Sequence, residues 1–302
     1  MSADGPLAAA RVGAAASLDA EAARCVLVGL IGSGIQASRS PALHEREGAA
    51  QGLAYIYKIV DLDDLGLTAA ALPELVAAAR RFGFAGLNIT HPCKQAVIPL
   101  LDELSPDARA LGAVNTVVFA PDGRAVGHNT DWSGFAESFK RGLPDAARHA
   151  VVQFGAGGAG AAVAHALLTL GVGELAIVDT DRARAQRLAR DLCRRFGAHR
   201  AVACADPAPA IHVADGIVNA TPIGMAKYPG MPVASELLRP DLWVADIVYL
   251  PLETELLRRA RALGCRTLSG GGMAVFQAAG AFRLFSGLAP DVERMIRHFE
   301  SM

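Results

Sequence analysis

The chain has 302 residues, of which 52% are hydrophobic and 20% are charged, and its formal net charge is −1. A chain of this length can form two domains and bury a large core, which argues against global disorder. Its 29 basic and 30 acidic residues form no block of like charge, which argues against binding to a nucleic acid backbone or an anionic membrane.

Cysteine usage and the N-terminal composition narrow the class of protein further. The five cysteines form no CxxC pair and are odd in number, so the sequence predicts neither a disulfide framework nor a metal site. We expect a cytoplasmic protein with reduced thiols. Residues 1–22 lack the cationic start of a signal peptide and show no periodicity, so we expect a flexible extension there.

The first half of the chain alternates strands and helices. Short apolar runs that end in turn residues predict strands at 25–31, 55–60 and 86–89. Helices are expected at 40–50, where Ser40 offers a capping hydroxyl and Pro41 fits the first turn, at about 73–81 and at about 94–101. Residues 114–119 and 124–128 predict a hairpin at the margin of a mostly parallel sheet.

A second alternating set begins at Ala150. Strands are predicted at 151–154, 175–178, 216–219 and 242–248, with helices at about 159–170 and 182–195. Residues 150–173 carry no Asp, Glu, Lys or Arg, but their glycines favour a strand, a turn and a buried helix over a membrane span. Helices at 273–286 and 291–299 are expected to return to the first domain. The sequence thus predicts an α/β protein of two domains.

A glycine-rich loop opens the second set. Gly155, Gly157 and Gly160 follow an apolar strand and precede a helix, which is the context of a dinucleotide-binding turn rather than an ordinary tight turn. In that motif the first glycine permits the turn, the second lets backbone N–H groups approach a pyrophosphate, and the third lets helix and strand pack closely. The N-terminus of the helix favours the anion.

Asp179 indicates which dinucleotide is bound. It ends the next predicted strand, 24 residues after Gly155, close to the spacing of the acid that accepts hydrogen bonds from the adenosine ribose. A carboxylate there repels a 2′-phosphate, which favours NAD over NADP. The alternative is that Asp179 merely caps the helix that begins near Asp181. Arg182 and Arg184 keep NADP open, unless they belong to a solvated helix face.

Lys94 and Asp131 lie upstream of this loop, 37 residues apart. Carbonyl reduction by hydride leaves an alkoxide that must gain a proton, so such an enzyme needs a positioned acid/base. Burial helps a lysine to release its proton, whereas a tight carboxylate partner opposes the release. We therefore expect both groups to contact one substrate hydroxyl rather than to form a tight ion pair. Alone they would read as surface charges, but short polar residues at predicted strand ends and turns accompany them: Asn88, Thr90, Asn115, Thr116, Asn129 and Thr130.

Together these residues resemble the shikimate/quinate dehydrogenase family. The matching segments run in family order over roughly residues 25–300; they are 29–32, 38–44, 88–94, 112–116, 129–131 with 134–135, the glycine loop, 219–225, 246–251 and 270–277. The resemblance implies an N-terminal substrate-binding catalytic domain at 23–131, to which the C-terminal helices at 273–302 return, and a Rossmann NAD-binding domain at 132–272.

The resemblance also implies roles for individual residues. Lys94 and Asp131 would be the catalytic pair. The substrate would be bound by Ser38 and Ser40 at its carboxylate and by Thr90, Asn115 and Gln277 at its hydroxyls. The residues implied at the cofactor are Gly155, Ala156, Gly157, Gly158, Asp179, Arg184, Pro222, Ile223, Gly224, Met225, Ile247 and Gly270. The alternatives are helix capping for the two serines and a solvent-facing position for Gln277.

Departures from the family pattern bear on specificity. Asp179-Thr180-Asp181 stands where NADP-type members resemble Asn-Arg-Thr, so the chain is similar to the NAD-preferring quinate/shikimate branch, in which Arg184 would approach the adenosine ribose. Cys93, Arg39 and Trp132 are unusual neighbours of the site and leave the substrate preference open. We expect reversible, NAD-dependent oxidation at the C3 hydroxyl of shikimate, and of quinate as well, by a monomer or homodimer. The alternatives are an enzyme for quinate or an amino-substituted relative, and a non-catalytic NAD-binding sensor.

Overall fold

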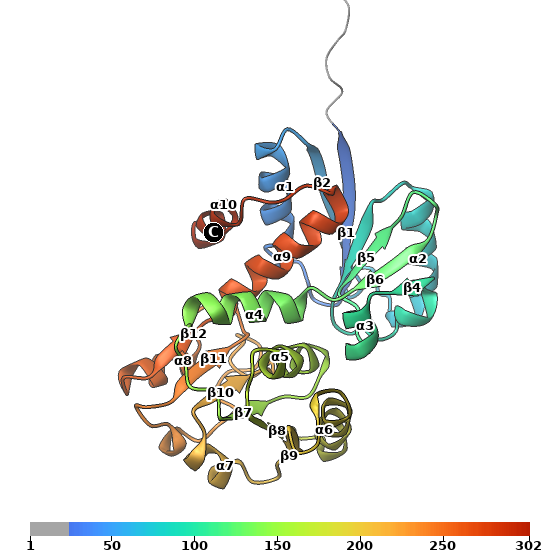
Figure 1. Cartoon of the computed structure of the whole chain (residues 1–302). Coiled ribbons are helices and arrows are strands. Elements are labelled where there is room, and N and C mark those ends of the chain that lie inside the picture. Colours follow the sequence, from blue (N-terminus) through green and yellow to red (C-terminus); the bar gives the residue numbers. More distant parts are fainter. Residues whose placement is uncertain (1–23) are drawn as a thin grey trace, which may run out of the picture.

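The computed structural model describes residues 24–302, and the extension expected at 1–22 lies outside the described residues. The described chain forms two domains, each built on a six-stranded sheet with helices on its faces (Figure 1). The predicted α/β class is confirmed. Within the described residues, no helix combines the length and the apolar surface needed to cross a bilayer.

The first sheet is mixed, in the order β2-β1-β3-β5-β6-β4. β1 pairs in parallel with β2 and β3, whereas β5 runs antiparallel to β3 and β6. The expected hairpin is present as β5 and β6, but the short strand β4 forms the edge beyond it, so its placement at the margin was wrong. The strands are β1 (Cys25–Gly32), β2 (Ala54–Asp61), β3 (Gly86–Ile89), β4 (Glu103–Leu104), β5 (Thr116–Phe119) and β6 (Ala125–His128).

The helices of this domain are α1 (Ser40–Ala50), α2 (Leu72–Arg81) and α3 (Pro106–Leu111), with a 3-10 turn η1 (Ala69–Ala71). The helix predicted at 94–101 is wrong, because these residues form a turn and a short 3-10 segment, η2 (Ile98–Leu100). Pro99 explains the difference. It lacks a backbone N–H, and in an α-helix its ring would collide with the carbonyl of Gln95.

The second sheet is parallel throughout, in the order β12-β11-β10-β7-β8-β9. The chain reverses its direction of winding between β7 and β10, and such a switch point opens a crevice at the carboxyl ends of the strands. The strands are β7 (Ala150–Phe154), β8 (Glu174–Val178), β9 (Ala201–Ala203), β10 (Gly216–Asn219), β11 (Trp243–Asp246) and β12 (Arg266–Leu268). The helices are α5 (Gly158–Thr169), α6 (Arg182–Phe196), α7 (Pro207–Val213) and α8 (Glu255–Ala262), with η3 (Ser235–Leu237).

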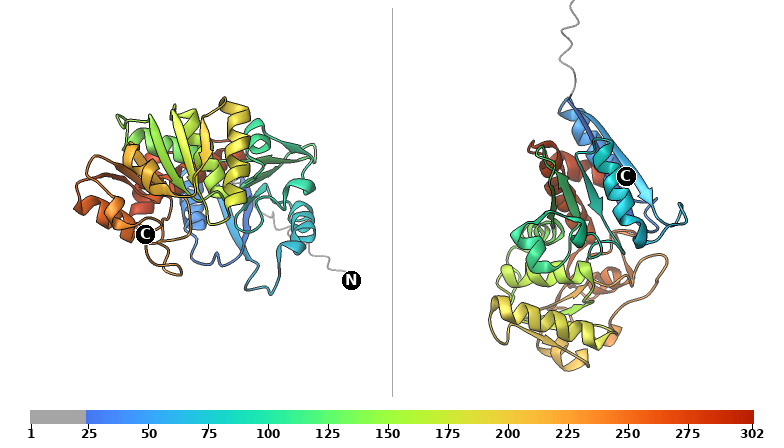
Figure 2. Two further views of the ribbon diagram at one scale, coloured as in Figure 1. Left: turned by 90° about the horizontal axis from the view of Figure 1, so that it is seen from below. Right: turned by 90° about the vertical axis from the view of Figure 1, so that its right-hand side faces the viewer.

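Three helices join the domains. α4 (Asp131–Gly142), which the sequence analysis did not predict, lies between the two sheets and packs on α5 and α9. α9 (Gly270–Ser286) leaves the second domain and packs against β1 and β5 of the first, and α10 (Val292–Glu300) packs on α9 and α1. The predicted return of the C-terminal helices is confirmed, and both views of Figure 2 show them beside the N-terminal elements.

Candidate active site

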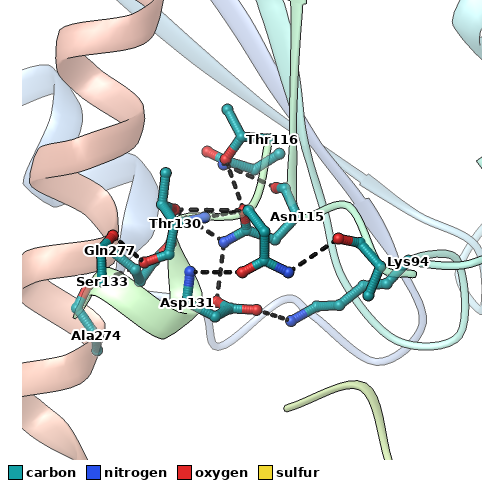
Figure 3. A network of polar contacts seen from close by, with 11 residues as sticks. Lys94, Asn115, Thr116, Thr130, Asp131, Ser133, Ala274 and Gln277 are labelled. Carbon is teal, nitrogen blue, oxygen red and sulfur yellow. Dashed lines mark hydrogen bonds and ion pairs between the residues drawn. The ribbon is translucent and has the colours of Figure 1, made fainter. Parts of the chain in front are cut away.

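Lys94 and Asp131 form a direct ion pair, with 2.6 Å between Nζ and Oδ2 (Figure 3). Lys94 lies in the turn that follows β3, and Asp131 is the first residue of α4. The side chains are only 17% and 8% exposed, so water screens the pair weakly. The expectation that the two groups avoid a tight pair was wrong for this structure. The missed helix α4 explains the geometry, because its first turn carries the carboxylate to the lysine.

Asn115 holds the other side of the same carboxylate. Its amide nitrogen donates to Asp131 Oδ1 and to Thr130 Oγ1, both at 2.9 Å, and its Oδ1 accepts from the Thr130 backbone N–H at 2.8 Å. Both amide hydrogens of Asn115 are therefore engaged. Asp131 also donates its own backbone N–H to Asn129 Oδ1 at 3.0 Å. The carboxylate is thus fixed in both position and rotation.

Ser38 and Ser40 lie at the end of the loop between β1 and α1. Asp61, at the end of β2, accepts hydrogen bonds from the backbone N–H groups of Gly34 and Ile35 at 2.8 and 2.7 Å and so fixes this loop. Burial acts to raise the pKa of Asp61, but these backbone hydrogen bonds outweigh it and hold the pKa below its ordinary value. The sequence analysis missed Asp61, although an acid at the end of a strand was the available signal.

The capping alternative for the serines is only partly supported. Ser40 is the first helical residue of α1 and provides no cap, while Ser38 Oγ accepts from the Ser40 backbone N–H at 3.3 Å. Arg39, between them, lies with its guanidinium 5.0 Å from the centre of the Phe299 ring in α10. Arg39, which departs from the family pattern, thus contacts the C-terminal helix α10.

Two tyrosines beside the serines were missed by the sequence analysis. Burial raises the pKa of Tyr57, opposed in part by a hydrogen bond with Ser40, and its hydroxyl donates to Asn88 Oδ1 at 2.8 Å. Burial also raises the pKa of Tyr249, again opposed by a hydrogen bond, here with Ser38. Tyr249 follows β11 in the second domain, so the serine loop contacts both domains.

Thr90 and Gln277 are the two other residues expected at the substrate hydroxyls, and they come from elements far apart in the sequence. Thr90 directly follows strand β3 and is half-buried, and its backbone N–H donates to Ile31 O. Gln277 lies on α9 beside Thr130 and Ser133 in Figure 3, and its amide donates to Ala274 O at 3.1 Å. It is half-buried against α4, so the alternative of a solvent-facing Gln277 does not hold.

The glycine loop has the geometry that its sequence predicts. Gly155 has φ +99°, and a Cβ there would lie 2.5 Å from Ala220 O, while a Cβ on Gly160 would lie 2.3 Å from Gly155 O. Around Gly157 the space is open, which leaves room for a pyrophosphate against the backbone. A Cβ on Gly158 would lie 3.8 Å from Lys94 Cδ, so the loop faces Lys94.

Gln153 supports this loop and was not predicted from the sequence. It lies on β7, is fully buried, and donates its amide hydrogens to the carbonyl oxygens of Gly155 and Gly160, both at 2.8 Å. A polar residue in the middle of an apolar strand was the signal that could have identified it, because a buried amide needs partners. Gln153 thereby ties the turn of the loop to the first turn of α5.

Asp179 is oriented by the glycine loop rather than by α6. Its Oδ2 accepts from the Ala156 backbone N–H at 2.7 Å, and its Oδ1 accepts from the Asp181 N–H at 2.8 Å. The cap of α6 is Asp181, which accepts from the Arg184 N–H, so the alternative role of Asp179 as the helix cap was wrong. Arg184 lies with NH1 3.8 Å from Asp179 Oδ2, beside the ribose position that the fold implies.

The segments expected at the nicotinamide side meet at the carboxyl ends of β10 and β11. Asn219 donates to Ile223 O at 2.8 Å, and Ile223 forms an isolated bridge with Met225, which shapes the turn at Pro222 and Gly224. A Cβ on Gly270 would lie 2.3 Å from Ile247 O, so the start of α9 touches this edge of the sheet.

Asp246 organises this edge and was missed by the sequence analysis. Its carboxylate accepts from Asn219 Nδ2 at 3.0 Å, from the Val248 N–H at 3.0 Å and from Thr254 Oγ1 at 2.8 Å. Burial raises its pKa, with these hydrogen bonds in opposition. Among the described residues, no group of three His, Cys, Asp or Glu side chains is placed to hold a metal ion.

Comparison with known proteins agrees with this geometry. A family model described as the shikimate dehydrogenase substrate binding domain matches residues 30–117. A shikimate dehydrogenase (NADP(+)) of Streptomyces avermitilis is 65% identical over 272 residues, which cover 89% of this chain and 93% of the relative. A quinate/shikimate dehydrogenase (NAD(+)) of Corynebacterium efficiens is 54% identical over 92% of this chain and 98% of its own.

A solved structure shows the same similarity in three dimensions. Quinate dehydrogenase from Corynebacterium glutamicum in complex with NAD superimposes with a TM-score of 0.87 and 52% identity, over 92% of this chain and 100% of that chain. Sequence, fold and site agree, and the resemblance stated from the sequence is confirmed. The chain belongs to the shikimate/quinate dehydrogenase family of oxidoreductases.

Proposed function

We propose that the protein is an NAD-dependent dehydrogenase that interconverts shikimate and 3-dehydroshikimate and that also accepts quinate. The contact between the glycine loop and Lys94 carries this proposal. A Cβ added to Gly158 would lie 3.8 Å from Lys94 Cδ, and this closeness supports a hydride carrier bound beside the proposed acid/base. Reversible hydride transfer at a ring carbon that bears a hydroxyl or a ketone needs this juxtaposition.

The residues of the cleft would act as follows. Ser38 and Ser40 would bind the substrate carboxylate, and Thr90, Asn115 and Gln277 would act at its hydroxyls. NAD, when bound, supplies the acceptor for the hydride. During ketone reduction, the ammonium form of Lys94 would donate the proton that the alkoxide needs. In the oxidation direction, the neutral amine of Lys94 would accept the proton of the substrate hydroxyl and become the ammonium, while Asp131 would orient that hydroxyl.

Asp179 supports NAD as the cofactor. The relatives point both ways, because the one from Streptomyces is named for NADP and those from Corynebacterium for NAD. The carboxylate of Asp179 is 7% exposed and lies at the end of β8, where a dinucleotide-binding fold places the adenosine ribose. Its charge would repel a 2′-phosphate at short range and accept hydrogen bonds from ribose hydroxyls.

Initial rates with shikimate, with quinate and with an amino-substituted analogue, each with NAD and NADP, test the proposal. We expect turnover of shikimate with NAD and a higher kcat/KM for NAD than for NADP. Equal efficiency with NADP would refute the interpretation of Asp179. Turnover of the amino analogue or of quinate alone would reassign the substrate, and NAD binding without oxidation of any cyclic acid would indicate a sensor.

Domain limits, assembly and location belong to the same proposal. We assign residues 23–131 and 273–302 to substrate binding and 132–272 to NAD binding, in a cytoplasmic monomer or homodimer. The parallel second sheet and the packing of α9 and α10 on the first domain support this division. Light scattering coupled to size-exclusion chromatography would distinguish the monomer from the dimer.

A further inference from the structure

The strand register of the first sheet places Thr116 opposite Asn88. β3 and β5 are antiparallel, and Asn88 is the direct partner of Thr116. Side chains of directly opposed residues lie on the same face of the sheet within reach of each other. Both are buried, Thr116 completely, and Asn88 Nδ2 donates to Thr116 Oγ1 at 3.0 Å.

This contact decides where the single hydroxyl proton of Thr116 points. Because Thr116 Oγ1 accepts from Asn88, its proton is free to donate to Asn115 Oδ1, at 3.0 Å. That bond and the one from the Thr130 backbone N–H at 2.8 Å together hold the oxygen end of the Asn115 amide, and its nitrogen end then faces Asp131. The opposite orientation would turn an oxygen toward the Asp131 carboxylate, where it has no proton to donate.

Tyr57 fixes the other end of this series of hydrogen bonds. Its ring crosses β1 from β2, and its hydroxyl donates to Asn88 Oδ1 at 2.8 Å. The Asn88 amide nitrogen must then face Thr116 and the Asn115 carbonyl, to which it donates at 3.0 and 3.1 Å. The side-chain hydrogen bonds thus run in one direction, from Tyr57 through Asn88, Thr116 and Asn115 to Asp131, and Figure 3 shows the last three together.

We infer that Thr116 is a positioning residue for the proposed catalytic pair: its hydroxyl, together with the Thr130 backbone N–H, holds the Asn115 amide in place and thereby sets the placement of Asp131 against Lys94. Thr116 itself is buried behind Asn115 and has no role in binding the ring. The kinetic part of this inference rests on the proposed dehydrogenase activity. Its structural part, the orientation of Asn115, does not.

The Thr116→Val variant tests the inference, because it removes the hydroxyl with little change in volume. We expect kcat for shikimate oxidation with NAD to fall roughly 10- to 100-fold, as for a buried polar group left unpaired in the transition state. KM for NAD should stay within about threefold, because no cofactor contact changes, and kcat should fall by a larger factor than KM for shikimate rises, because Asn115 remains present at the substrate hydroxyls. Thr116→Ser, which keeps the hydroxyl, should restore kcat to within about threefold of the parent.

The control is Ser286→Ala, which removes an equally buried hydroxyl that donates to Phe282 O, far from the pair along α9. It should leave kcat unchanged. A Thr116→Val enzyme with parental kcat would overturn the inference, and so would a Thr116→Ser enzyme as damaged as the valine variant. If Thr116→Val does not fold, the Tyr57→Phe variant is used instead, because it removes the first donor of this series of hydrogen bonds. An unchanged kcat in that variant would overturn the inference as well.

Crystal structures of the parent and of Thr116→Val give a readout that needs no turnover. We expect the Asn115 side chain to shift from its parental position and the contact between Lys94 Nζ and Asp131 Oδ2 to lengthen from 2.6 Å in the variant. An unchanged Asn115 and an unchanged ion pair would refute the positioning role. A parent enzyme that oxidises no cyclic acid would refute the proposed function instead, and the two failures are therefore distinguishable.

Discussion

At the scale of single residues, the site depends on how one carboxylate is shared. Asp131 is bonded by Lys94 on one oxygen and by Asn115 on the other, and both contacts are shielded from water. A substrate hydroxyl that enters must exchange hydrogen bonds with this carboxylate and with the amine together. In the proposed mechanism, Lys94 Nζ would therefore meet the reacting oxygen already oriented, which would limit the reorganisation needed during proton transfer.

The Lys94→Ala substitution should abolish proton transfer without disturbing the cofactor loop. Loss of a positioned acid/base typically costs about 10²- to 10⁴-fold in rate, so we expect kcat to fall within that range. Binding of NAD, measured by calorimetry, should be unchanged. Lys140→Ala, an exposed lysine in the last turn of α4, is the control and should behave as the parent. A Lys94→Ala enzyme within tenfold of parental turnover would exclude lysine as the acid/base.

Asp179 should govern the choice of cofactor. In the Asp179→Asn variant the negative charge is lost. Two backbone N–H groups donate to the parental carboxylate, and one of them loses its acceptor in the variant. Hydrogen bonds to a charged group contribute about 1.5–3 kcal/mol, so the ratio of kcat/KM for NAD to that for NADP should fall at least about tenfold. Asp191→Asn, which removes an exposed carboxylate from α6, should leave the ratio at its parental value. Parallel rate measurements with both cofactors decide the point; a ratio that does not move would assign discrimination to other residues.

At the scale of helices and strands, the local sequence pattern was sufficient to predict an element that is long and has clear boundary residues. The strands β1, β3, β7 and β10 follow from apolar runs, and α5 and α6 follow from the glycine loop and from helical periodicity. The three-residue strands β9 and β12 carry too little periodicity to be recognised. They exist because neighbouring strands offer hydrogen-bonding partners, which is a tertiary effect.

The same division holds for the site. Lys94, Asp131 and the glycines were identified from their spacing and motifs. The contact between Lys94 and Asp131 could not be predicted, because it depends on how α4 is placed. The orientation of Asn115 by Thr116 depends on the pairing of β3 with β5. Tyr249 comes from the other domain and approaches Ser38 only after the chain has folded. Residues that act through tertiary neighbours leave no local signal in a single sequence.

The C-terminal helix α10 is held to α1 by one buried carboxylate. Glu47 accepts from Arg294 Nε and NH2, both at 2.8 Å, and from the Asp291 backbone N–H at 2.8 Å. Burial acts to raise the pKa of Glu47, but the hydrogen bonds from Arg294, Asp291 and Gln51 outweigh it, so the pKa is lowered. A lowered pKa in the folded state stabilises the protein above the ordinary pKa of the group, and this stability is lost as the pH falls below about 4.5.

Glu47→Gln should therefore destabilise the protein at neutral pH and have a smaller effect in acid. Loss of a charged acceptor with several donors, beside a partly exposed arginine, should cost about 1–3 kcal/mol, or roughly 3–6 °C in the midpoint of thermal unfolding at pH 7. At pH 3.5 the difference from the parent should shrink, because this carboxylate is then largely protonated in the unfolded parental chain and the stabilisation from its lowered pKa diminishes. Glu137→Gln breaks an exposed pair with Arg141 and should change the midpoint little at either pH. An effect of Glu47→Gln that does not depend on pH would rule out the charge as its cause.

At the scale of the whole molecule, the crossing of α4 and α9 connects the domains and carries residues of the site on both helices. Asp131 begins α4, and Gln277 lies in the middle of α9. The helices approach closely because glycines face the contact. A Cβ on Gly134 would lie 2.8 Å from Gln277 N and 3.0 Å from Met273 O, and a Cβ on Gly272 would lie 2.2 Å from Ser138 Oγ. The distance between Asp131 and the proposed substrate ligand on α9 is therefore set by a close approach at which Gly134 and Gly272 present no side chain.

Gly134→Ala tests this coupling. Alanine favours the helix over glycine by about 0.5–1 kcal/mol, but its Cβ would meet backbone atoms of α9 that cannot rotate away, and such overpacking costs about 1–3 kcal/mol. We expect a lower midpoint of thermal unfolding and, because Asp131 and Gln277 would separate, a fall in kcat/KM for shikimate of at least about tenfold. Gly142→Ala, on the same helix, meets only the flexible end of Leu268, so its midpoint and kcat/KM should match the parent. Equal behaviour of the two variants would show that the helices adjust freely and that their separation does not set the geometry of the site.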